Sequence, residues 1–166
     1  MAMSRWLFLC VALLCGLLMG VALFMEHVMG LEPCPLCMLQ RAAVIATGLA
    51  ALVPALLHPR GWGVRAWGAL VSLFSLTGVG LAWRQLWLQS LPEEEVPPCG
   101  PGYEYLRETF PLMDLVQMAV EGTGDCAEVQ WTFLGLSIPG WTWVFFAVTA
   151  IAGGYLLVRG GSAARA

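Results

Sequence analysis

Four long apolar stretches dominate the pattern of hydrophobic and polar positions along this chain. They run approximately over residues 6–25, 38–57, 64–88 and 138–158. A helix that crosses a bilayer needs about 20 predominantly apolar residues, and each stretch meets that length. The third stretch is the longest and carries Arg84 and Gln85 near its far end, so we expect its lipid-facing part to stop close to Leu81. The pattern predicts an all-α membrane protein built as a bundle of four transmembrane helices.

The first apolar stretch is predicted to be a retained helix. Its apolar run is longer than the roughly 7–15 residues of the central region of a signal peptide. It also lacks a small-x-small cleavage site before Glu26.

Composition supports a membrane protein and narrows its partners. The chain has 166 residues, of which 59% are hydrophobic and 11% are charged, and its mean hydropathy is +0.76. Soluble domains carry about 25% charged residues. The net charge is −3, and the chain contains no lysine and no basic stripe, which argues against nucleic acid as a partner. We expect residues 1–166 to form one integral membrane domain with the lipid bilayer as its surroundings.

Arginine positions predict the orientation. One side of the membrane would hold five arginines, namely Arg5, Arg60, Arg65, Arg159 and Arg165, and the other side would hold Arg41, Arg84 and Arg107. The positive-inside rule counts these residues and places the richer side in the cytoplasm. Both termini are therefore predicted to be cytoplasmic, and segments 26–37 and 89–137 are predicted to be periplasmic loops.

A Cys-x-x-Cys pair lies where the first outer loop meets the second apolar stretch. Cys34 and Cys37 form a dithiol that can close into a disulfide with little backbone movement. Pro35 is favoured at the first position of a helix, so Cys34 is predicted to be the N-cap and Cys37 the third helical residue. Both sulfurs would then lie near the positive end of the helix dipole, which favours the thiolate.

Arg41 follows Cys37 by four residues and is expected to lie one turn along the same helix face. Long helical side chains lean toward the N-terminus, which predicts that the guanidinium points at the Cys37 sulfur. The simpler interpretation is an arginine that extends to the membrane interface, as is common at helix ends.

The second outer loop is nearly fifty residues long and carries Cys99 and Cys126. Its first part, residues 91–102, holds four prolines, two glycines and a Glu triplet, and is predicted to be a helix-free stretch with Cys99 at its tip. Apolar residues recur at helical spacing further on, at Leu112, Leu115, Val116 and Ala119. They predict a short amphipathic helix that lies on the bilayer or packs against protein.

Disulfides persist outside the cytoplasm, so these four cysteines are the candidate redox groups. Cys10 and Cys15 lie inside the first apolar stretch, five residues and about 140° apart on a helix. They are predicted to pack as small hydrophobic residues.

Two segments carry a resemblance to a known family. Residues 32–41 (EPCPLCMLQR) and residues 124–136 (GDCAEVQWTFLGL) closely resemble the bacterial DsbB family. The Cys-x-x-Cys alone is a weak signal, whereas its combination with the arginine and the second segment is specific. The resemblance covers essentially the whole chain.

The resemblance implies a quinone-dependent thiol oxidase of the inner membrane that reoxidises a DsbA-type periplasmic oxidase. By analogy, Cys99 forms the mixed disulfide with that partner and Cys126 is the partner of Cys99. Electrons would pass through an interloop disulfide to Cys34 and Cys37. Cys37 would face a ubiquinone or menaquinone, with Arg41 near the quinone oxygen.

The chain departs from the family at one candidate quinone contact. The best-studied member has a histidine near the outer end of its third helix, and the matching position here is Gln85. Glutamine donates hydrogen bonds but does not titrate near neutral pH, so a proton-relay role at this position is in doubt. Arg84 is a second cation or an interfacial anchor, and His27 either caps the first helix or lies near the dithiol. Five tryptophans fit an interfacial belt, namely Trp83, Trp87, Trp131, Trp141 and Trp143.

Alternative functions remain open at the level of sequence. A family paralogue could serve a dedicated oxidoreductase. The cysteines, with Met29 and Met38 nearby, could handle a soft metal such as Cu(I), although no His/Cys cluster has the spacing of a zinc site. A structural membrane protein with incidental disulfides is the third alternative.

Overall fold

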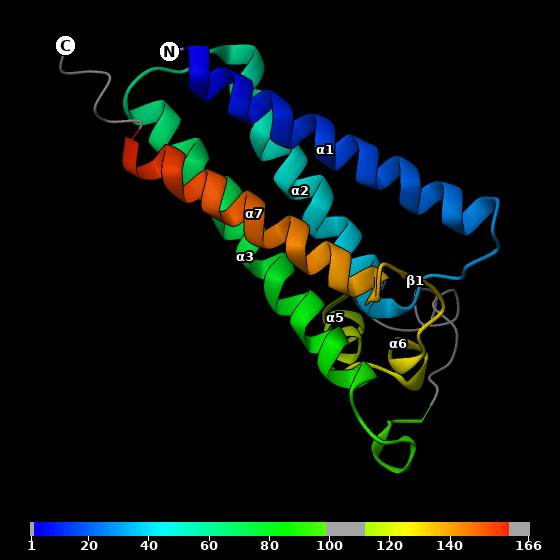
Figure 1. Ribbon diagram of the computed structural model, residues 1–166. Coiled ribbons are helices and arrows are strands. Elements are labelled where there is room, and N and C mark those ends of the chain that lie inside the picture. The colour runs from blue at the N-terminus through cyan, green and yellow to red at the C-terminus, as the bar shows by residue number, and fades with distance from the viewer. Residues whose placement is uncertain (1, 99–111, 160–166) are drawn as a thin grey trace.

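The computed structural model describes residues 2–98 and 112–159. Among these residues, four helices are long and apolar enough to cross a membrane. They are α1 (Ala2–His27), α2 (Pro35–Leu57), α3 (Trp62–Gln89) and α7 (Ile138–Arg159), shown side by side in Figure 1. The predicted bundle of four membrane helices is confirmed, and the four spans differ from the predicted bounds by at most three residues at either end.

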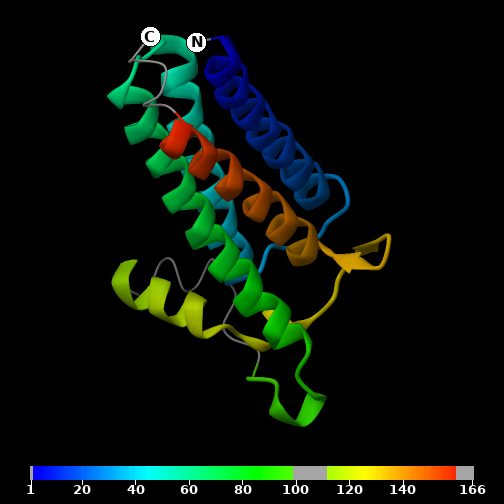
Figure 2. The same ribbon diagram turned by 60° about the vertical axis from the view of Figure 1, so that its left-hand side comes forward.

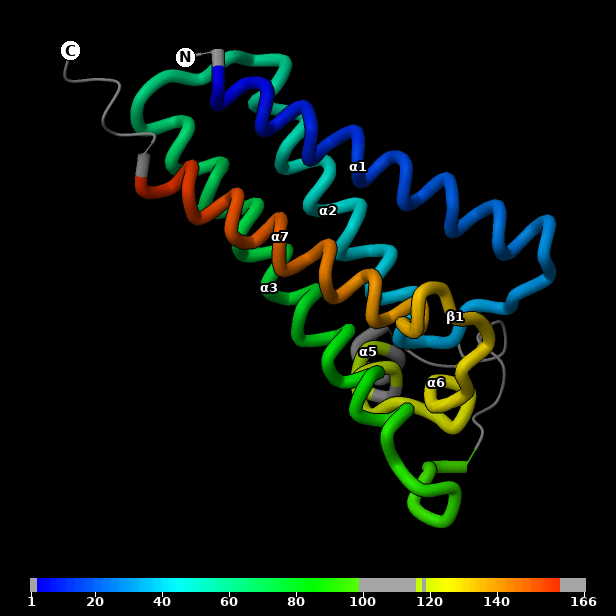
Figure 3. The backbone as a smooth tube through the Cα atoms, viewed as in Figure 1, coloured from blue at the N-terminus to red at the C-terminus, as the bar shows by residue number. Residues whose placement is uncertain are grey.

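The two ends of the bundle differ in what they carry. The N-terminal end of α1, the α2–α3 connection and the last turn of α7 lie together at one end, as the tube in Figure 3 traces. The α1–α2 connection lies at the opposite end with five short elements. These are η1 (Glu93–Glu95), α5 (Leu112–Glu121), α6 (Gly124–Ala127), β1 (Thr132–Phe133) and β2 (Leu136–Ser137).

The bundle core lies between helices that pack in the order α1, α2, α3 and α7. Its largest buried side chains include Phe8, Val71 and Phe146. Many Leu, Val and Ile side chains on the outer faces of the helices are exposed, which is the arrangement expected of a protein surrounded by lipid.

The contact between α3 and α7 depends on small residues. A Cβ atom added at Gly153 would lie 2.8 Å from the Gly68 carbonyl oxygen and 2.7 Å from Ser72 Oγ. The Ser72 hydroxyl donates a hydrogen bond of 2.9 Å to the Ala150 carbonyl. Small residues let the two backbones approach closely, which is the usual basis of helix association in lipid.

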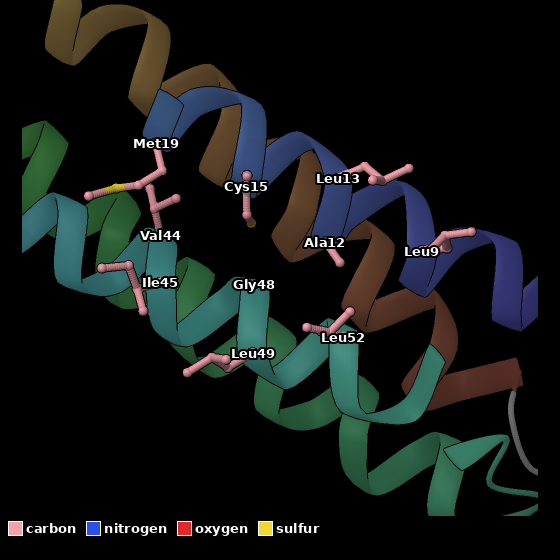
Figure 4. A pocket seen from close by; sticks show the side chains of 11 residues that line it. Leu9, Ala12, Leu13, Cys15, Met19, Val44, Ile45, Gly48, Leu49 and Leu52 are labelled. Atoms are coloured by element: carbon pink, nitrogen blue, oxygen red, sulfur yellow. The ribbon is translucent and has the colours of Figure 1, made fainter. Parts of the chain in front are cut away.

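Helices α1 and α2 pack closely at Cys15, and an apolar groove lies between them beside this residue. Cys15 is buried against Gly48, where an added Cβ would lie 2.9 Å from Cys15 Cβ, whereas Cys10 is exposed on another face of α1. This agrees with the predicted separation of the two residues by about 140° around the helix. Next to Cys15 lies an apolar groove of about 300 Å³ lined by α1 and α2 side chains (Figure 4).

The predicted amphipathic helix is present as α5 and lies across the end of the bundle (Figure 2). Ala119 is buried, and Val116 and Val120 are exposed. Arg84 of α3 donates to the last carbonyls of α5, with 2.8 Å to the Glu121 oxygen. A cation at a helix C-terminus is favourable, so Arg84 acts as an anchor for α5.

A small β-hairpin precedes α7, and the sequence analysis did not predict it. Phe133 pairs with Leu136, and the two-residue turn between them has positive φ at Leu134 (50°) and Gly135 (79°). Positive φ at both positions is typical of a type I′ turn, which normally carries Asn-Gly. Leucine in this conformation gives no turn signal in the sequence, which is why the hairpin was missed. The Trp141 indole fixes the hairpin by donating to the Phe133 carbonyl at 3.0 Å.

The small-residue contact predicts a difference between two glycine substitutions. We expect Gly153→Ala to lower the free energy of unfolding by about 1–3 kcal/mol, because the new methyl group meets backbone atoms of α3 that cannot move aside. Gly80→Ala is the matched control, since nothing lies within 4 Å of its Cβ position. It should be neutral or stabilising by up to about 1 kcal/mol. Unfolding in mixed detergent micelles measures both, and equal destabilisation by the two variants would contradict this account.

Candidate functional site

The cysteine pair of the first outer loop begins α2. Cys34 is the N-cap with extended backbone (φ −71°, ψ 163°), and Pro35 is the first helical residue. The backbone N–H of Cys37 donates to the Cys34 sulfur at 3.3 Å, and the two sulfurs lie 2.8 Å apart. The predicted capping role of Cys34 is confirmed. A disulfide bond is about 2.05 Å long, so these thiols can close into one with a small shift.

Cys126 of the second outer loop lies against this pair. It is fully buried in α6 and forms hydrogen bonds with the Cys34 side chain and the backbone of Leu36. Leu36 and Leu88, each 0% exposed, complete a small apolar cluster around the two sulfurs. Gly122, with φ +81°, permits this approach because a side chain there would overlap Leu88. The fold therefore joins sulfurs that are 92 residues apart in sequence.

Hydrogen bonding among the sulfurs shifts the pKa values of Cys126 and Cys34 in opposite directions. The hydrogen bond with Cys34 lowers the pKa of Cys126 to about 6, although burial opposes this shift. The pKa of Cys34 is raised by its hydrogen bonds to Cys126 and Cys37 and by burial. The arrangement favours a Cys34 thiol that donates its proton toward a Cys126 thiolate.

Gln85 of α3 lies against both sulfurs of the first pair. Its amide nitrogen is 3.4 Å from Cys34 Sγ and 3.4 Å from Cys37 Sγ. The Gln85 side chain is 3% exposed, so it reaches the sulfurs from inside the bundle. The structure thus brings the predicted Gln85 to the dithiol.

Gln40 and Thr142 extend this contact and were missed by the sequence analysis. Gln40 Nε2 donates to Gln85 Oε1 at 2.6 Å, and the Thr142 hydroxyl donates to Gln40 Oε1 at 2.6 Å. The available signal was a glutamine near the start of an apolar stretch, but its partners on two other helices were not visible in the sequence.

Arg41 differs from its prediction. Its guanidinium forms a salt bridge with Glu26 and donates to the Ala22 carbonyl at 3.3 Å, and both partners belong to the last turns of α1. The prediction that the guanidinium points at the Cys37 sulfur is wrong. A carboxylate is a stronger partner for a guanidinium at a membrane boundary than a thiol, and the leaning side chain reaches α1 instead. Gln85 supplies the donor that Arg41 was expected to provide.

The remaining candidates lie away from the sulfurs or outside the described part of the chain. The exposed His27 ring forms a hydrogen bond of 3.0 Å with the Leu23 carbonyl, which matches the predicted cap of the first helix. The Arg84 guanidinium lies 4.3 Å above the Trp87 ring while it binds α5. Cys99 and Arg107 fall outside the described residues. The residue before Cys99, Pro98, accepts a hydrogen bond of 3.3 Å from the Gly124 backbone.

Within residues 2–98 and 112–159, no group of three or more His, Cys, Asp or Glu side chains has a geometry suited to a metal ion. The clustered sulfurs have the proximity that disulfide exchange needs. Thiol–disulfide exchange requires a thiolate near a second sulfur, and the Cys126–Cys34–Cys37 series provides that proximity.

Comparison with known proteins gives a consistent result. The family described as "Disulfide bond formation protein DsbB" matches residues 4–156. A protein named Disulfide bond formation protein B from Marinobacter nauticus is 53% identical over 156 residues, which cover 94% of this chain and 93% of that protein. Proteins of the same name from Hahella chejuensis and Nitrosococcus oceani are 51% and 44% identical, over 90% and 96% of this chain and 94% and 95% of their own lengths.

The lowered pKa of Cys126 predicts the pH dependence of its labelling. In the reduced protein, the Cys126 thiolate should persist as pH falls below about 8.5, the ordinary value for cysteine, and be lost through about pH 6. The pH midpoint of modification by methyl methanethiosulfonate, read by peptide mass spectrometry, measures this. Burial slows labelling at every pH without moving the midpoint.

Two variants of Cys34 test the cause of that low midpoint. Cys34→Ala removes the donor and should raise the Cys126 midpoint, whereas Cys34→Ser keeps a donor and should hold it low. A midpoint that is unchanged in Cys34→Ala would show that the hydrogen bond from Cys34 is not responsible.

Proposed function

The chain belongs to the DsbB family, and we propose that it reoxidises a periplasmic DsbA-type thiol oxidase and passes the electrons to membrane quinone. The four apolar helices indicate a multi-pass membrane protein, and family membership indicates that it takes part in disulfide bond formation. The finer assignment of partner and acceptor is the proposal. The observation that carries it is the contact of Cys34 with both Cys37 and Cys126.

The first proposed step is exchange with the periplasmic partner. A thiolate of reduced DsbA attacks Cys99 in a Cys99–Cys126 disulfide, which breaks that bond, forms a mixed disulfide and releases the Cys126 thiolate. The second DsbA thiol then displaces Cys99. DsbA leaves oxidised, and the Cys99–Cys126 pair holds two electrons as a dithiol. The hydrogen bonds of the Leu36 and Thr123 backbone with the Cys126 sulfur support this order, because they stabilise the released thiolate whatever the state of Cys34.

The second proposed step transfers the electrons between the two cysteine pairs. The Cys126 thiolate attacks Cys34 in a Cys34–Cys37 disulfide, forming an interloop Cys126–Cys34 bond and releasing the Cys37 thiolate. Cys99 attacks Cys126 and releases Cys34, so one disulfide is broken and one is made at each exchange. The Gln85 amide, 3.4 Å from both sulfurs, can donate to whichever sulfur becomes charged.

Three residues would hold the quinone at the outer end of the bundle. Cys37 is partly exposed there, the Gln85 amide supplies a hydrogen-bond donor, and Arg41 supplies a cation near the membrane boundary. This donor set suits a ligand with carbonyl oxygens and an apolar body. A bound ubiquinone or menaquinone accepts two electrons and two protons. The protein's part is to hold the Cys37 sulfur at the membrane edge, with the Gln85 amide against it and Arg41 one helical turn further along α2.

The proposed setting is the bacterial inner membrane, with the cysteines in the periplasm and the termini in the cytoplasm. The five arginines of the opposite side support this orientation, because positive residues favour the cytoplasmic side. The periplasm also allows disulfides to persist.

The assigned electron path predicts separate defects for two cysteines. Cys37→Ser should abolish quinol formation but still form a mixed disulfide with DsbA, whereas Cys99→Ser should abolish reaction with DsbA. Both are measured with purified protein, reduced DsbA and a soluble quinone analogue, following thiol loss and quinol together. Cys10→Ala, on the lipid-exposed face of α1, is the control. Full turnover by Cys37→Ser would contradict the path, and stoichiometric Cu(I) binding without quinol would favour a metal carrier.

The Arg41 assignment predicts a specific defect in quinone use. Arg41→Met should raise the KM for quinone about tenfold, because a charge-assisted hydrogen bond is lost, while single-turnover exchange with DsbA stays unchanged. Glu26→Gln removes the salt bridge but keeps the guanidinium, so its quinone KM should not rise. If both variants raise the KM equally, Arg41 acts only as the partner of Glu26. Arg60→Met, in the α2–α3 connection at the other end of the bundle, is the charge control.

A further inference from the structure

We propose that Gln40 and Thr142 are positioning residues that orient the Gln85 amide, with its NH2 group toward Cys34 and Cys37, and so set how readily that pair is reduced. The inference deepens the proposed function, since it concerns the same cysteine pair, and rests on that function for its role in turnover. The redox equilibrium itself can be measured without quinone or DsbA.

The contacts form one continuous chain across three helices. The Thr142 hydroxyl of α7 lies 2.6 Å from Gln40 Oε1 of α2, and Gln40 Nε2 lies 2.6 Å from Gln85 Oε1 of α3. Gln85 Nε2 then lies 3.4 Å from each sulfur. The Gln85 oxygen, 3.7 Å from the Cys37 sulfur, is held by Gln40 at the much shorter distance.

Because both glutamines are buried, this series of hydrogen bonds decides how the Gln85 amide is oriented. Gln40 and Gln85 are 4% and 3% exposed, so their amides depend on protein partners. A side-chain amide has nearly the same shape after a half turn, and its partners decide which end faces which way. A hydroxyl that donates to the Gln40 oxygen leaves the Gln40 NH2 for Gln85, which turns the Gln85 NH2 to the sulfurs. Thr142 also lies 3.0 Å from the Pro139 carbonyl of its own helix, so Gln40 competes for its single proton.

The orientation has a chemical consequence for the cysteine pair. An N–H donor stabilises a thiolate more than it stabilises a disulfide sulfur, whereas a carbonyl oxygen in its place would repel the thiolate. The relevant exchange is Cys34–Cys37 disulfide plus two glutathione thiols giving the Cys34/Cys37 dithiol plus glutathione disulfide. A correctly oriented Gln85 shifts this equilibrium toward the dithiol, which makes the disulfide the better oxidant.

The test compares matched variants of α7 in the full chain. Thr142→Val removes the hydroxyl that begins the chain of contacts. Thr149→Val makes the same substitution seven residues along the helix, where a buried hydroxyl accepts from Ser75 at 2.9 Å, far from the sulfurs. Thr142→Ser keeps a hydroxyl, and Gln40→Met breaks the next contact. Each purified protein is equilibrated in glutathione buffers, trapped by alkylation, and scored by mass spectrometry of the Cys34–Cys37 peptide.

We expect Thr142→Val and Gln40→Met to lower the equilibrium constant for reduction of this pair about tenfold. Thr149→Val and Thr142→Ser should stay within about twofold of the parent protein. Cys15, buried between α1 and α2, reports a loss of fold by becoming alkylated. Equal constants for Thr142→Val and Thr149→Val, with Cys15 protected in both, would overturn the proposal. A parent protein that fails to make quinol would instead contradict the proposed function and leave this equilibrium unaffected.

Discussion

The contact of one sulfur with two others is the interaction on which the rest of this structure depends. Cys34 lies 2.8 Å from Cys37 and in hydrogen-bond contact with Cys126. A sulfur holds one disulfide bond at a time, so Cys34 can join either neighbour but never both. The N-terminus of α2 fixes Cys34 and Cys37, and the burial of Leu36 and Leu88 brings α6 close enough to add the third sulfur.

The polar side chains that surround the sulfurs are uncharged, and one charge pair lies near the edge of the site. Around the sulfurs, polarity comes from the Gln85 amide and its partners, which carry no net charge and need no counter-ion. The only described salt bridge joins Arg41 to Glu26, one helical turn beyond Cys37. Isolated charges are costly in a region of low dielectric, whereas paired charges and satisfied amides are tolerated. The structure therefore keeps hydrogen-bond donors beside the reactive sulfurs without placing an unpaired cation there.

Local sequence patterns predicted the helices and the N-cap, but they did not predict the contacts between segments that are distant in the sequence. The four spans, the α5 helix and the N-cap at Cys34 follow from apolar length, periodicity and the position of Pro35. The direction of Arg41 depended on whether a carboxylate at the end of another helix lay within reach, which residue spacing cannot tell. Likewise, the role of Gln40 could not be predicted from the sequence, because it depends on Gln85 of α3 and Thr142 of α7, which lie beside it only in the folded protein. The family resemblance named the cysteines but not these neutral partners.

Two arginines on α3 bind the ends of different neighbours. Near the N-terminus of α3, Arg65 donates to the Leu157 carbonyl in the last turn of α7, and near its C-terminus Arg84 donates to the Glu121 carbonyl of α5. Sliding of packed helices past each other is a common route of conformational change. Here, axial displacement of α3 in either direction would break a hydrogen bond at one end or the other. The two contacts therefore oppose such sliding from both ends of α3 and help to keep Gln85 level with the sulfurs.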